Sequence, residues 1–572
     1  MSFRWVYSKP EQEESASVLE DQLGVPPVIA RLLSLRDVNT FYDAKTFFRP
    51  DIDHLHDPFL MKDMDKASRR LASAVCNHEK VLVYGDYDVD GTTATASLLL
   101  FLKNFGLDAT YYIPHRFKEG YGINPEGVKY ASEIGASLIV SVDCGITAVK
   151  EARQARELGI DLIICDHHTV GDKLPECIAV LDPKRSDCNY PFDGLSGAGV
   201  GFKLIQATIS KLGLGIDKSY EYLDLIAISI ASDIVPIIDE NRVLMRKGLE
   251  LINEKPRPGI KALIDLVQKN NSAEKVTTST IVFSIGPRIN AAGRMGDAAV
   301  AVELMISDSE ETAGRIASQL ETINDKRRET DRRTMDEALA MLDSKFDMEE
   351  LSSMVLHHPD WNLGVIGIVA SRLVDTYYRP AIMLSTVEGK IKGSARSVKG
   401  FNIYDALKEC EDLLEQFGGH EFAAGLTMEK ENLAEFRKRI NQIAFQKLQE
   451  NDFKPELMID SKMDLSHVDM KFWKLLSQFE PFGPGNLRPV FVSENVDIFG
   501  DPAIVGKGHL KMKIRQNGSG IFDAIGFNMH EFMPAVRKSK DCRVDVAYVI
   551  EENYWNNKRS LQLRLKDIHV AN

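Results

Sequence analysis

The residues best suited to chemistry are three aspartates that alternate over a short stretch. Asp86, Asp88 and Asp90 fall within VLVYGDYDVDG, residues 81–91, directly after an apolar run. Carboxylates this close repel one another unless a cation lies among them. A calcium loop of the EF-hand type also begins D-x-D-x-D-G, but its twelfth position would here be Ser97 rather than Glu, and a strand rather than a helix precedes it. The pattern predicts a metal site of another kind, with an acidic surface turn as the alternative.

Further acidic and imidazole side chains follow other apolar runs, and they are Asp143, Asp166, His167, His168 and Asp233. Because ligands gather beyond the carboxyl ends of parallel strands, we expect them to share one site with the aspartates. Carboxylate and imidazole groups without thiolates suit Mn²⁺ or Mg²⁺ better than structural zinc. Four or five carboxylates exceed the needs of one ion. Two ions roughly 3.5–4 Å apart, sharing one Asp, would explain the number and would suit hydrolysis at a phosphoryl centre.

Phosphate chemistry also needs cationic contacts, and three glycine-rich stretches offer them. GPRINAAGR at 286–294 supplies two arginines, GSARS at 393–397 supplies one, and FGGH at 417–420 supplies free backbone amides and an imidazole. Such turns are common, so each is weak alone. Together they predict parts of a phosphate cradle.

The elements that must position these residues alternate between strands and helices. Apolar runs at 81–84, 109–113, 138–142 and 162–165 predict buried strands, and 92–105 and 147–158 predict helices between them. This order implies an α/β fold with a parallel sheet. Residues 223–231 form a further apolar helix, in which we interpret Asp224 as a cap or packing residue.

The remainder of the chain predicts three further parts. A charged pattern without Pro at 303–346 predicts a long connecting helix, and 350–450 return to an α/β pattern. After about residue 455, short strands joined by Gly, Asn and Pro turns predict a small β-barrel. Tyr554 and Trp555 lie in one of these turns and could stack on bases.

Composition sets the broad class of the protein. The chain has 572 residues, 44% hydrophobic and 27% charged, which suits a multidomain globular protein. The seven cysteines are scattered without a CxxC pair, no apolar run reaches the roughly 20 residues of a membrane helix, and the polar N-terminus is unlike a signal peptide. We therefore expect a cytoplasmic location. The net charge of −14 argues weakly against nucleic acid as a partner, but residues 501–572 carry twelve Lys and Arg against eight Asp and Glu.

Several motifs resemble a known family. Asp-His-His at 166–168, with GDYDVDG at 85–91, VDCG at 142–145 and SDIVP at 232–236, resembles the DHH phosphoesterase superfamily. PHRFKEGYGIN at 114–124 and GPRINAAGR resemble the RecJ-type single-stranded-DNA exonucleases. WNLGVIGIVASR at 361–372, GSARS and GGHEFAAG at 418–425 resemble the DHHA1 domain, and the β-rich tail resembles an oligonucleotide-binding (OB) fold. The resemblance covers residues from about 20 to 570.

The resemblance implies a domain order. Residues 1–65 would be an N-terminal segment packing on the catalytic core, 66–300 the DHH catalytic domain, 301–349 the connecting helix, 350–453 the DHHA1 domain and 454–572 the OB fold. The chain ends soon after the barrel, so we expect the extra C-terminal domain of some longer relatives, and the partner contacts made through it, to be absent.

The resemblance also implies residue roles. The metal ligands would be Asp88, Asp90, Asp143, His167 and Asp233, with Asp143 as the bridge, and Asp86 would be a further ligand or a group that holds the ligands. His168 would orient the site or touch phosphate, and Arg288 would act at the reacting phosphate. The substrate would also contact Arg116, Asn290, Arg294, Ser394, Arg396, Gly419 and His420. Tyr84 stands where related pyrophosphatases have a ligand histidine, so we expect Asp86 to complete that site.

The implied activity is 5′-to-3′ hydrolysis of single-stranded DNA to 5′-mononucleotides in DNA repair and recombination, with two divalent ions, Mn²⁺ or Mg²⁺. Expected partners are single-stranded DNA, a single-stranded-DNA-binding protein and a helicase, but no membrane; we expect a monomer. One alternative is a small-nucleotide phosphodiesterase acting on nanoRNA or cyclic dinucleotides, against which the β-rich basic tail argues. The other is a non-catalytic strand-binding protein, against which the nearly complete ligand set argues.

Overall fold

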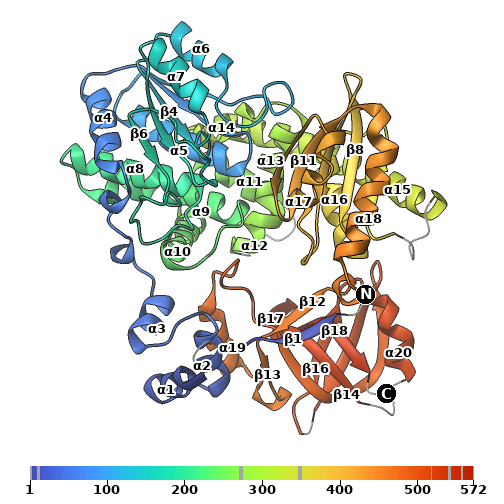
Figure 1. Cartoon of the computed structure of the whole chain (residues 1–572). Coiled ribbons are helices and arrows are strands. Elements are labelled where there is room, and N and C mark those ends of the chain that lie inside the picture. Colours follow the sequence, from blue (N-terminus) through green and yellow to red (C-terminus); the bar gives the residue numbers. More distant parts are fainter. Residues whose placement is uncertain are drawn as a thin grey trace. The chain divides into compact units, whose positions relative to one another are not determined.

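The structure is a computed structural model that describes residues 3–9, 13–268, 275–345, 351–516, 518–538, 543–555 and 558–570 (Figure 1). Within these residues, no helix combines the length and the hydropathy that crossing a membrane requires.

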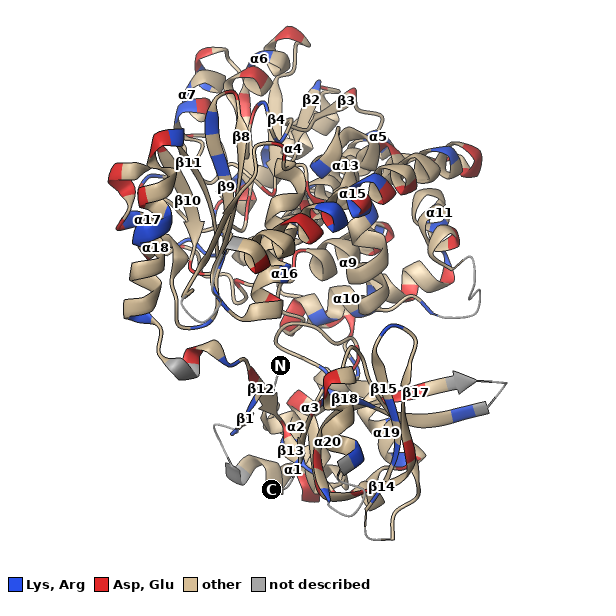
Figure 2. Cartoon of the chain, turned by 90° about the vertical axis from the view of Figure 1, so that its right-hand side faces the viewer, with Lys and Arg blue, Asp and Glu red and all other residues tan. Residues whose placement is uncertain are grey.

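The longest helix, α15 (Glu310–Lys345), has 36 residues and lacks proline. Figure 2 shows basic and acidic residues along it, as expected for a largely solvated helix face. The single helix predicted over 303–346 is in fact two helices, because α14 (Ala299–Ile306) ends before Ser307 and the Ser309 hydroxyl accepts a hydrogen bond from the Thr312 amide at the start of α15.

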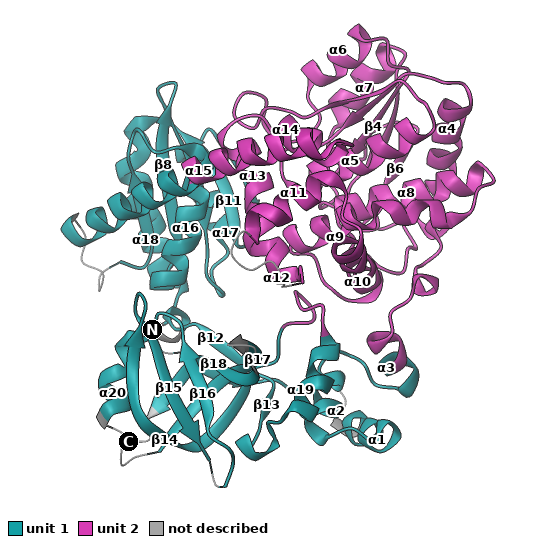
Figure 3. Ribbon diagram, turned by 180° about the vertical axis from the view of Figure 1, so that it is seen from behind, with its two compact units in different colours: residues 1–44, 328–479, 488–572 teal, residues 45–327, 480–487 magenta. Residues whose placement is uncertain are grey.

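The chain forms two compact units (Figure 3). Unit 2 comprises residues 45–327 and 480–487, and unit 1 comprises residues 1–44, 328–479 and 488–572. The boundary at 327/328 falls inside α15, so this helix belongs to both units.

Unit 2 contains a five-stranded sheet in the order β3-β2-β4-β5-β6. Its strands are β2 (Val81–Tyr84), β3 (Ala109–Tyr112), β4 (Leu138–Val142), β5 (Asp161–Cys165) and β6 (Ala179–Leu181). Every pairing is parallel, which confirms the predicted sheet, and β2 and β4 are buried along their whole length. Near-continuous apolar strands are typical of a sheet covered by helices on both faces.

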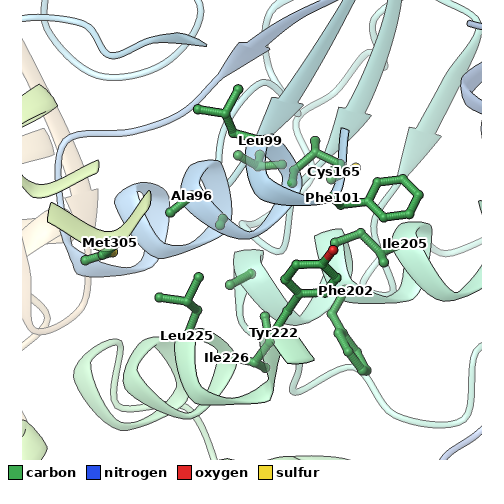
Figure 4. Packing of buried hydrophobic residues seen from close by; sticks show 14 of the residues in the cluster. Ala96, Leu99, Phe101, Cys165, Phe202, Ile205, Tyr222, Leu225, Ile226 and Met305 are labelled. Atoms are coloured by element: carbon green, nitrogen blue, oxygen red, sulfur yellow. The ribbon is translucent and has the colours of Figure 1, made fainter. Parts of the chain in front are cut away.

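Besides α14, the helices of unit 2 include α4 (Met64–Cys76), α5 (Val89–Asn104), α6 (Pro125–Glu133), α7 (Val149–Glu157), α8 (Gly197–Lys211), α9 (Leu223–Ser232), α10 (Asp239–Glu254), α11 (Pro258–Val267), α12 (Thr278–Thr280), the π-helical turn η4 (Ile281–Ile285) and α13 (Gly286–Met295). Helix α5 is almost wholly buried, and its Thr93, Thr95 and Ser97 hydroxyls donate to carbonyls of the same helix, as suits a helix inside a core. Figure 4 shows its Leu99 and Phe101 in the same packed cluster as Phe202 of α8 and Leu225 of α9. This packing fixes the position of the α5 N-terminus.

Unit 1 contains a second α/β layer and a barrel. The second layer has the sheet order β10-β11-β9-β8-β7. Its elements are β7 (Met354–His357), α16 (Leu363–Tyr377), β8 (Ala381–Val387), β9 (Lys390–Arg396), α17 (Ile403–Lys408), β10 (Gln416–His420), β11 (Ala423–Met428) and α18 (Leu433–Lys447). Only the β7–β8 pairing is parallel.

The tail forms the predicted barrel, in which β14 pairs with both β15 and β17 and so closes the sheet. Its elements are β13 (Ser461–Lys462), α19 (Met470–Leu476), β14 (Phe491–Val505), β15 (His509–Arg515), β16 (Phe522–Gly526), α20 (Met533–Lys538), β17 (Val544–Trp555) and β18 (Lys558–Val570). Tyr554 and Trp555 are the last residues of β17 rather than part of a turn, and their side chains lie outside the described residues.

The N-terminal segment differs from the expectation that residues 1–65 pack together on the catalytic core. Strand β1 (Arg4–Tyr7) pairs in parallel with β12 (Glu456–Ile459), which leads into the barrel. The Trp5 indole stacks on His569 at 3.8 Å between ring centroids and donates to Asp567 at 2.9 Å. Residues 1–44, with α1 (Glu13–Leu23) and α2 (Pro27–Ser34), therefore belong to unit 1, and the unit boundary lies within α3 (Phe41–Phe48).

Candidate metal centre

The carboxyl ends of three adjacent strands bring the predicted ligands together. Asp86 follows β2, Asp143 follows β4, and His167 follows β5. The His167 Nε2 lies 3.2 Å from Asp143 Oδ1, 3.6 Å from Asp90 Oδ2 and 3.6 Å from Asp233 Oδ2. The first turn of α5 supplies Asp90, and the end of α9 supplies Asp233. Four stretches of the sequence, at residues 86–90, 143, 167 and 233, thus converge on one point.

The ligand atoms fall into overlapping groups, within each of which all lie less than 4.8 Å apart. One group is Asp86, Asp88 and Asp143; a second is Asp90, His167 and Asp233; a third joins Asp143 to His167 and His168. Asp143 therefore connects the first group to the histidines. This is the position expected of a carboxylate shared by two ions.

The Asp90 carboxylate is held by hydrogen bonds that the sequence did not indicate. Gly197 N donates to it at 2.6 Å, Ala198 N at 2.9 Å and the Ser229 hydroxyl at 2.7 Å. The amides belong to the N-terminus of α8, a favourable place for an anion. Position 197 must be glycine, because a Cβ there would lie 2.5 Å from Asp143 Cβ. The LSGAGVG stretch at 195–201 is the signal that could have revealed this contact.

The crowded carboxylates are electrostatically unstable without a cation. Burial, reinforced by the charges of Asp90 and Asp88, raises the pKa of Asp143 well above its usual range and that of Asp233 to about 9. Burial lowers the pKa of His167, which favours the neutral ring that ligates metals. Asp86 Oδ1, Asp143 Oδ1 and both ring nitrogens of His167 are buried and accept or donate no hydrogen bond. These unsatisfied oxygen and nitrogen atoms fit divalent cations as their missing partners.

His168 is held by Asp166, a residue that belongs to none of the three ligand groups. Asp166 Oδ1 accepts from the His168 ring at 2.7 Å and from the amides of His167 and His168, while Oδ2 accepts from Ile146 N at 2.8 Å. Burial alone would raise the pKa of Asp166, but its bonds to His168 outweigh burial and lower it. The Tyr121 hydroxyl lies 3.0 Å from His168 Nδ1 and donates to the Asp143 carbonyl at 3.2 Å.

Two residues that the sequence did not favour as metal ligands, Tyr84 and Asp224, have partners within the protein. The Tyr84 hydroxyl donates to the Gly122 carbonyl at 3.1 Å, and burial raises the pKa of this phenol, so it is a poor ligand. Asp224 is buried and forms an ion pair with Arg257 at 2.6 Å, which confirms it as a packing residue.

A fourth strand end contributes residues that sequence reasoning missed. Strand β6 leads into Asp182, Pro183 and Lys184, and the Lys184 ammonium donates to the His167 carbonyl. The charge of Lys184 acts to lower the pKa values of both His167 and Asp233, so it lies beside the metal centre. Asp182 is buried, and its Oδ1 accepts from Lys184 N at 2.8 Å. The run AVLDPK repeats the pattern of an apolar strand followed by Asp.

Helix α13 contains the predicted Arg288, Asn290 and Arg294. It packs against the loop of residues 85–88 that holds Asp86 and Asp88, called the aspartate loop below. A Cβ at Gly293 would lie 2.3 Å from the Tyr87 carbonyl, and one at Gly286 would lie 2.9 Å from Ser232 Oγ. Its ends therefore touch the two segments that hold Asp86, Asp88 and Asp233.

The three predicted arginines of unit 2 differ in their partners. Arg288 is buried, with Nη2 2.9 Å from Glu321 Oε1, and it also donates to the Ser284 carbonyl. The Arg116 guanidinium lies 4.8 Å above the Tyr87 ring, and the charge of Arg294 also reaches Tyr87. Arg116 and Arg294 thus flank the aspartate loop, whereas Arg288 is held in place by Glu321.

The other predicted substrate contacts lie in unit 1, on neighbouring strands of the second sheet. Arg396 pairs with Ala423, which pairs with His420, so Arg396 and His420 share one row across β9, β11 and β10. Arg396 donates to the Ser394 hydroxyl at 2.9 Å. Gly419 has φ +144°, and a Cβ there would lie 2.3 Å from the Ala423 carbonyl. The structure thus brings Ser394, Arg396, Gly419 and His420 together.

Comparison with known proteins identifies the parts of the chain. Residues 80–230 match the DHH family N-terminal domain, 350–445 the DHHA1 domain and 459–567 the RecJ OB domain. The single-stranded-DNA-specific exonuclease RecJ of Bacillus subtilis (strain 168) is 39% identical over 99% of this chain and 71% of that protein. RecJ of Thermus thermophilus in complex with Mn²⁺ superposes with a TM-score of 0.84 and 28% identity over 99% of this chain and 79% of that one. The same protein in complex with Mg²⁺ gives a TM-score of 0.78 and 25% identity, covering 99% and 78%. The chain, with its DHH, DHHA1 and OB domains in this order, belongs to the RecJ family.

Proposed function

We propose that this chain is a single-stranded-DNA-specific exonuclease that hydrolyses phosphodiester bonds from the 5′ end and releases 5′-mononucleotides in DNA repair and recombination. The observation that carries the proposal is the convergence of Asp86, Asp88, Asp90, Asp143, His167 and Asp233 on one point with unsatisfied ligand atoms. The Bacillus relative is named a single-stranded-DNA-specific exonuclease, and the Thermus relative was solved in complex with Mn²⁺ and with Mg²⁺. The 5′-to-3′ direction rests on the family resemblance.

Two divalent ions, Mn²⁺ or Mg²⁺, would supply Lewis-acid activation of water and charge stabilisation at the phosphoryl oxygens. Asp86, Asp88 and Asp143 would hold one, and Asp90, His167 and Asp233, again with Asp143, the other. Asp166 orients His168 toward the same centre, and Lys184, Arg116 and Arg294 add positive charge for the phosphates of the strand.

The barrel offers a surface suited to unpaired DNA. Along β15, Lys511, Lys513 and Arg515 alternate with buried residues and face solvent. Phe499 is exposed and lies 5.7 Å below the Arg515 guanidinium. Phe527 is exposed as well, with Arg564 5.1 Å from its ring centroid and His509 packed edge-on. Cations interleaved with exposed aromatic rings bind a single strand by backbone charge and base stacking.

The two alternatives are less favoured. A small-nucleotide phosphodiesterase has no evident use for the OB domain matched at residues 459–567. A non-catalytic binding protein would not need six ligands assembled around unsatisfied atoms.

The test is digestion of single-stranded and duplex oligonucleotides labelled at either end, with Mn²⁺, with Mg²⁺ or with chelator. We expect mononucleotides from the 5′ end of single strands, loss of activity in chelator, and recovery with Mn²⁺ at least as great as with Mg²⁺, since an imidazole ligand favours the softer ion. Calcium should not support turnover. Shortening from the 3′ end would refute the direction, and full activity in chelator would refute the metal mechanism.

A further inference from the structure

Ile234 stands directly beside the metal centre in an unusual conformation. It follows Asp233, whose Oδ2 is 3.6 Å from His167 Nε2. Its backbone has φ +61°, in the left-handed region, and its side chain is 66% exposed. A β-branched residue in this region is a genuine outlier.

Neither helix termination nor packing explains an isoleucine at this position. Helix α9 ends at Ser232, Asp233 is its C-cap, and the left-handed residue after a C-cap is usually glycine. Glycine would adopt φ +61° without strain, and the exposed side chain adds little to the core. Strained residues of this kind cluster at functional sites.

A second exposed hydrophobic residue lies on an element packed against the same helix end. Phe283 is 75% exposed and lies in η4, a π-helical turn of a type frequent at functional sites. At the junction of η4 and α13, Gly286 approaches Ser232 so closely that a Cβ would lie 2.9 Å from Ser232 Oγ. Two large apolar side chains thus project from the two elements that meet beside Asp233.

We propose that Ile234, together with Phe283, contacts the base and sugar of the unpaired nucleotide whose phosphate is held at the metal centre. The inference rests on the proposed function, because a phosphodiester at the ions brings its own nucleoside within reach of residue 234. Apolar contact and stacking are available to every base, since every base has a π-face, and they read no hydrogen-bonding pattern. Such a contact positions a strand of any sequence, as an enzyme that removes successive nucleotides requires.

The test combines Ile234→Gly with an abasic nucleotide at the cleaved end of a single-stranded substrate. In the wild-type protein, loss of the base should lower kcat/KM about 10-fold, the loss that one such contact implies. In each of the single variants Ile234→Gly and Phe283→Ala, the same abasic change should lower kcat/KM less than about 3-fold, because the variant has already lost its contact with the base. Affinity for Mn²⁺ should be unchanged in both variants.

Two further variants separate this role from a backbone effect. Ile234→Asn keeps a side chain that tolerates the left-handed region and should behave as Ile234→Gly does. His78→Gly is the matched control, since His78 is exposed, has φ 52° after the C-cap of α4, and lies before β2, at the opposite end of the sheet from the metal centre. Both glycine variants should raise Tm, by about 2–4 °C each, by relieving the same strain, and His78→Gly should leave kcat/KM unchanged.

Equal losses from the abasic change in the wild-type protein and in Ile234→Gly would overturn this inference alone. Failure of the wild-type protein to cleave single-stranded DNA would overturn the proposed function and the inference with it.

Discussion

Replacing Asp166 by Asn should weaken the metal centre without removing a ligand. The Asp166 carboxylate accepts four hydrogen bonds, three at Oδ1 from His167 N, His168 N and the His168 ring, and one at Oδ2 from Ile146 N. An asparagine that keeps the three bonds turns its amide nitrogen toward Ile146 N, and two donors then face each other. The opposite orientation leaves His167 N, His168 N and the His168 ring without an acceptor, and so costs more free energy of unfolding.

The magnitude follows from these contacts. One buried donor left unsatisfied costs about 1–3 kcal/mol of unfolding free energy. The bond to the His168 ring also loses its charge assistance, which roughly halves its strength. Because loss of a residue that orients a metal site typically costs about 10–100-fold, we expect Mn²⁺ affinity and kcat to fall within that range.

Urea unfolding, calorimetric titration with Mn²⁺ and single-strand digestion would measure these three quantities. Asp224→Asn is the matched control, because Asp224 is equally buried but is paired with Arg257 rather than with the histidines. It should lose stability and keep its affinity for Mn²⁺. If Asp166→Asn also kept wild-type affinity and rate, the assignment of Asp166 as the residue that positions His168 would be wrong.

Three further predictions concern other parts of the molecule. Asp143→Ala should reduce hydrolysis to below about a tenth of the wild-type rate while retaining single-strand binding, since the carboxylate shared by the ligand groups is lost; electrophoretic mobility shift and digestion would check both. Lys511→Ala combined with Lys513→Ala should lower the slope of log Kd against log salt by about 1.4, at roughly 0.7 per phosphate contact, whereas exposed Lys438→Ala on α18 should leave it unchanged. Burial raises the pKa of Asp182 from 3.8 to about 7, so the folded state binds this proton more tightly than the unfolded chain and loses stability as pH rises through that window; urea unfolding at pH 5 and pH 8 should show a smaller loss in Asp182→Asn than in the wild-type protein, since the raised pKa values of Asp143 and Asp233 act in the same direction in both.

The sequence predicted the parallel sheet and most of the cluster of acidic and histidine side chains at its edge, because both follow from local patterns. An apolar run followed by Asp or His can be recognised in the sequence itself. The parallel order of the strands brings their carboxyl ends together, as for Asp86, Asp143 and His167. Strand β6 was missed because three residues are too few to show a pattern.

Contacts between distant segments could not be predicted in this way. The amides of α8 that hold Asp90 lie 107 and 108 residues from it. The pairing of Arg288 with Glu321 depends on how α13 packs, and the pairing of β1 with β12 joins residues 452 apart. No local periodicity carries such information.

The pairing of β1 with β12 also has a consequence for protein synthesis. Unit 2 is nearly one continuous stretch of chain, residues 45–327, and can acquire its sheet while the ribosome is still adding the later domains. The first strand must wait for its partner, because Arg4 has no Glu456 to face until 452 more residues are made. At about 5–20 residues per second, this interval lasts roughly 20–90 s. During this interval, Trp5 and the apolar face of α2 lack the barrel that covers them. These apolar groups of the nascent chain are therefore open to aggregation until the barrel has been made.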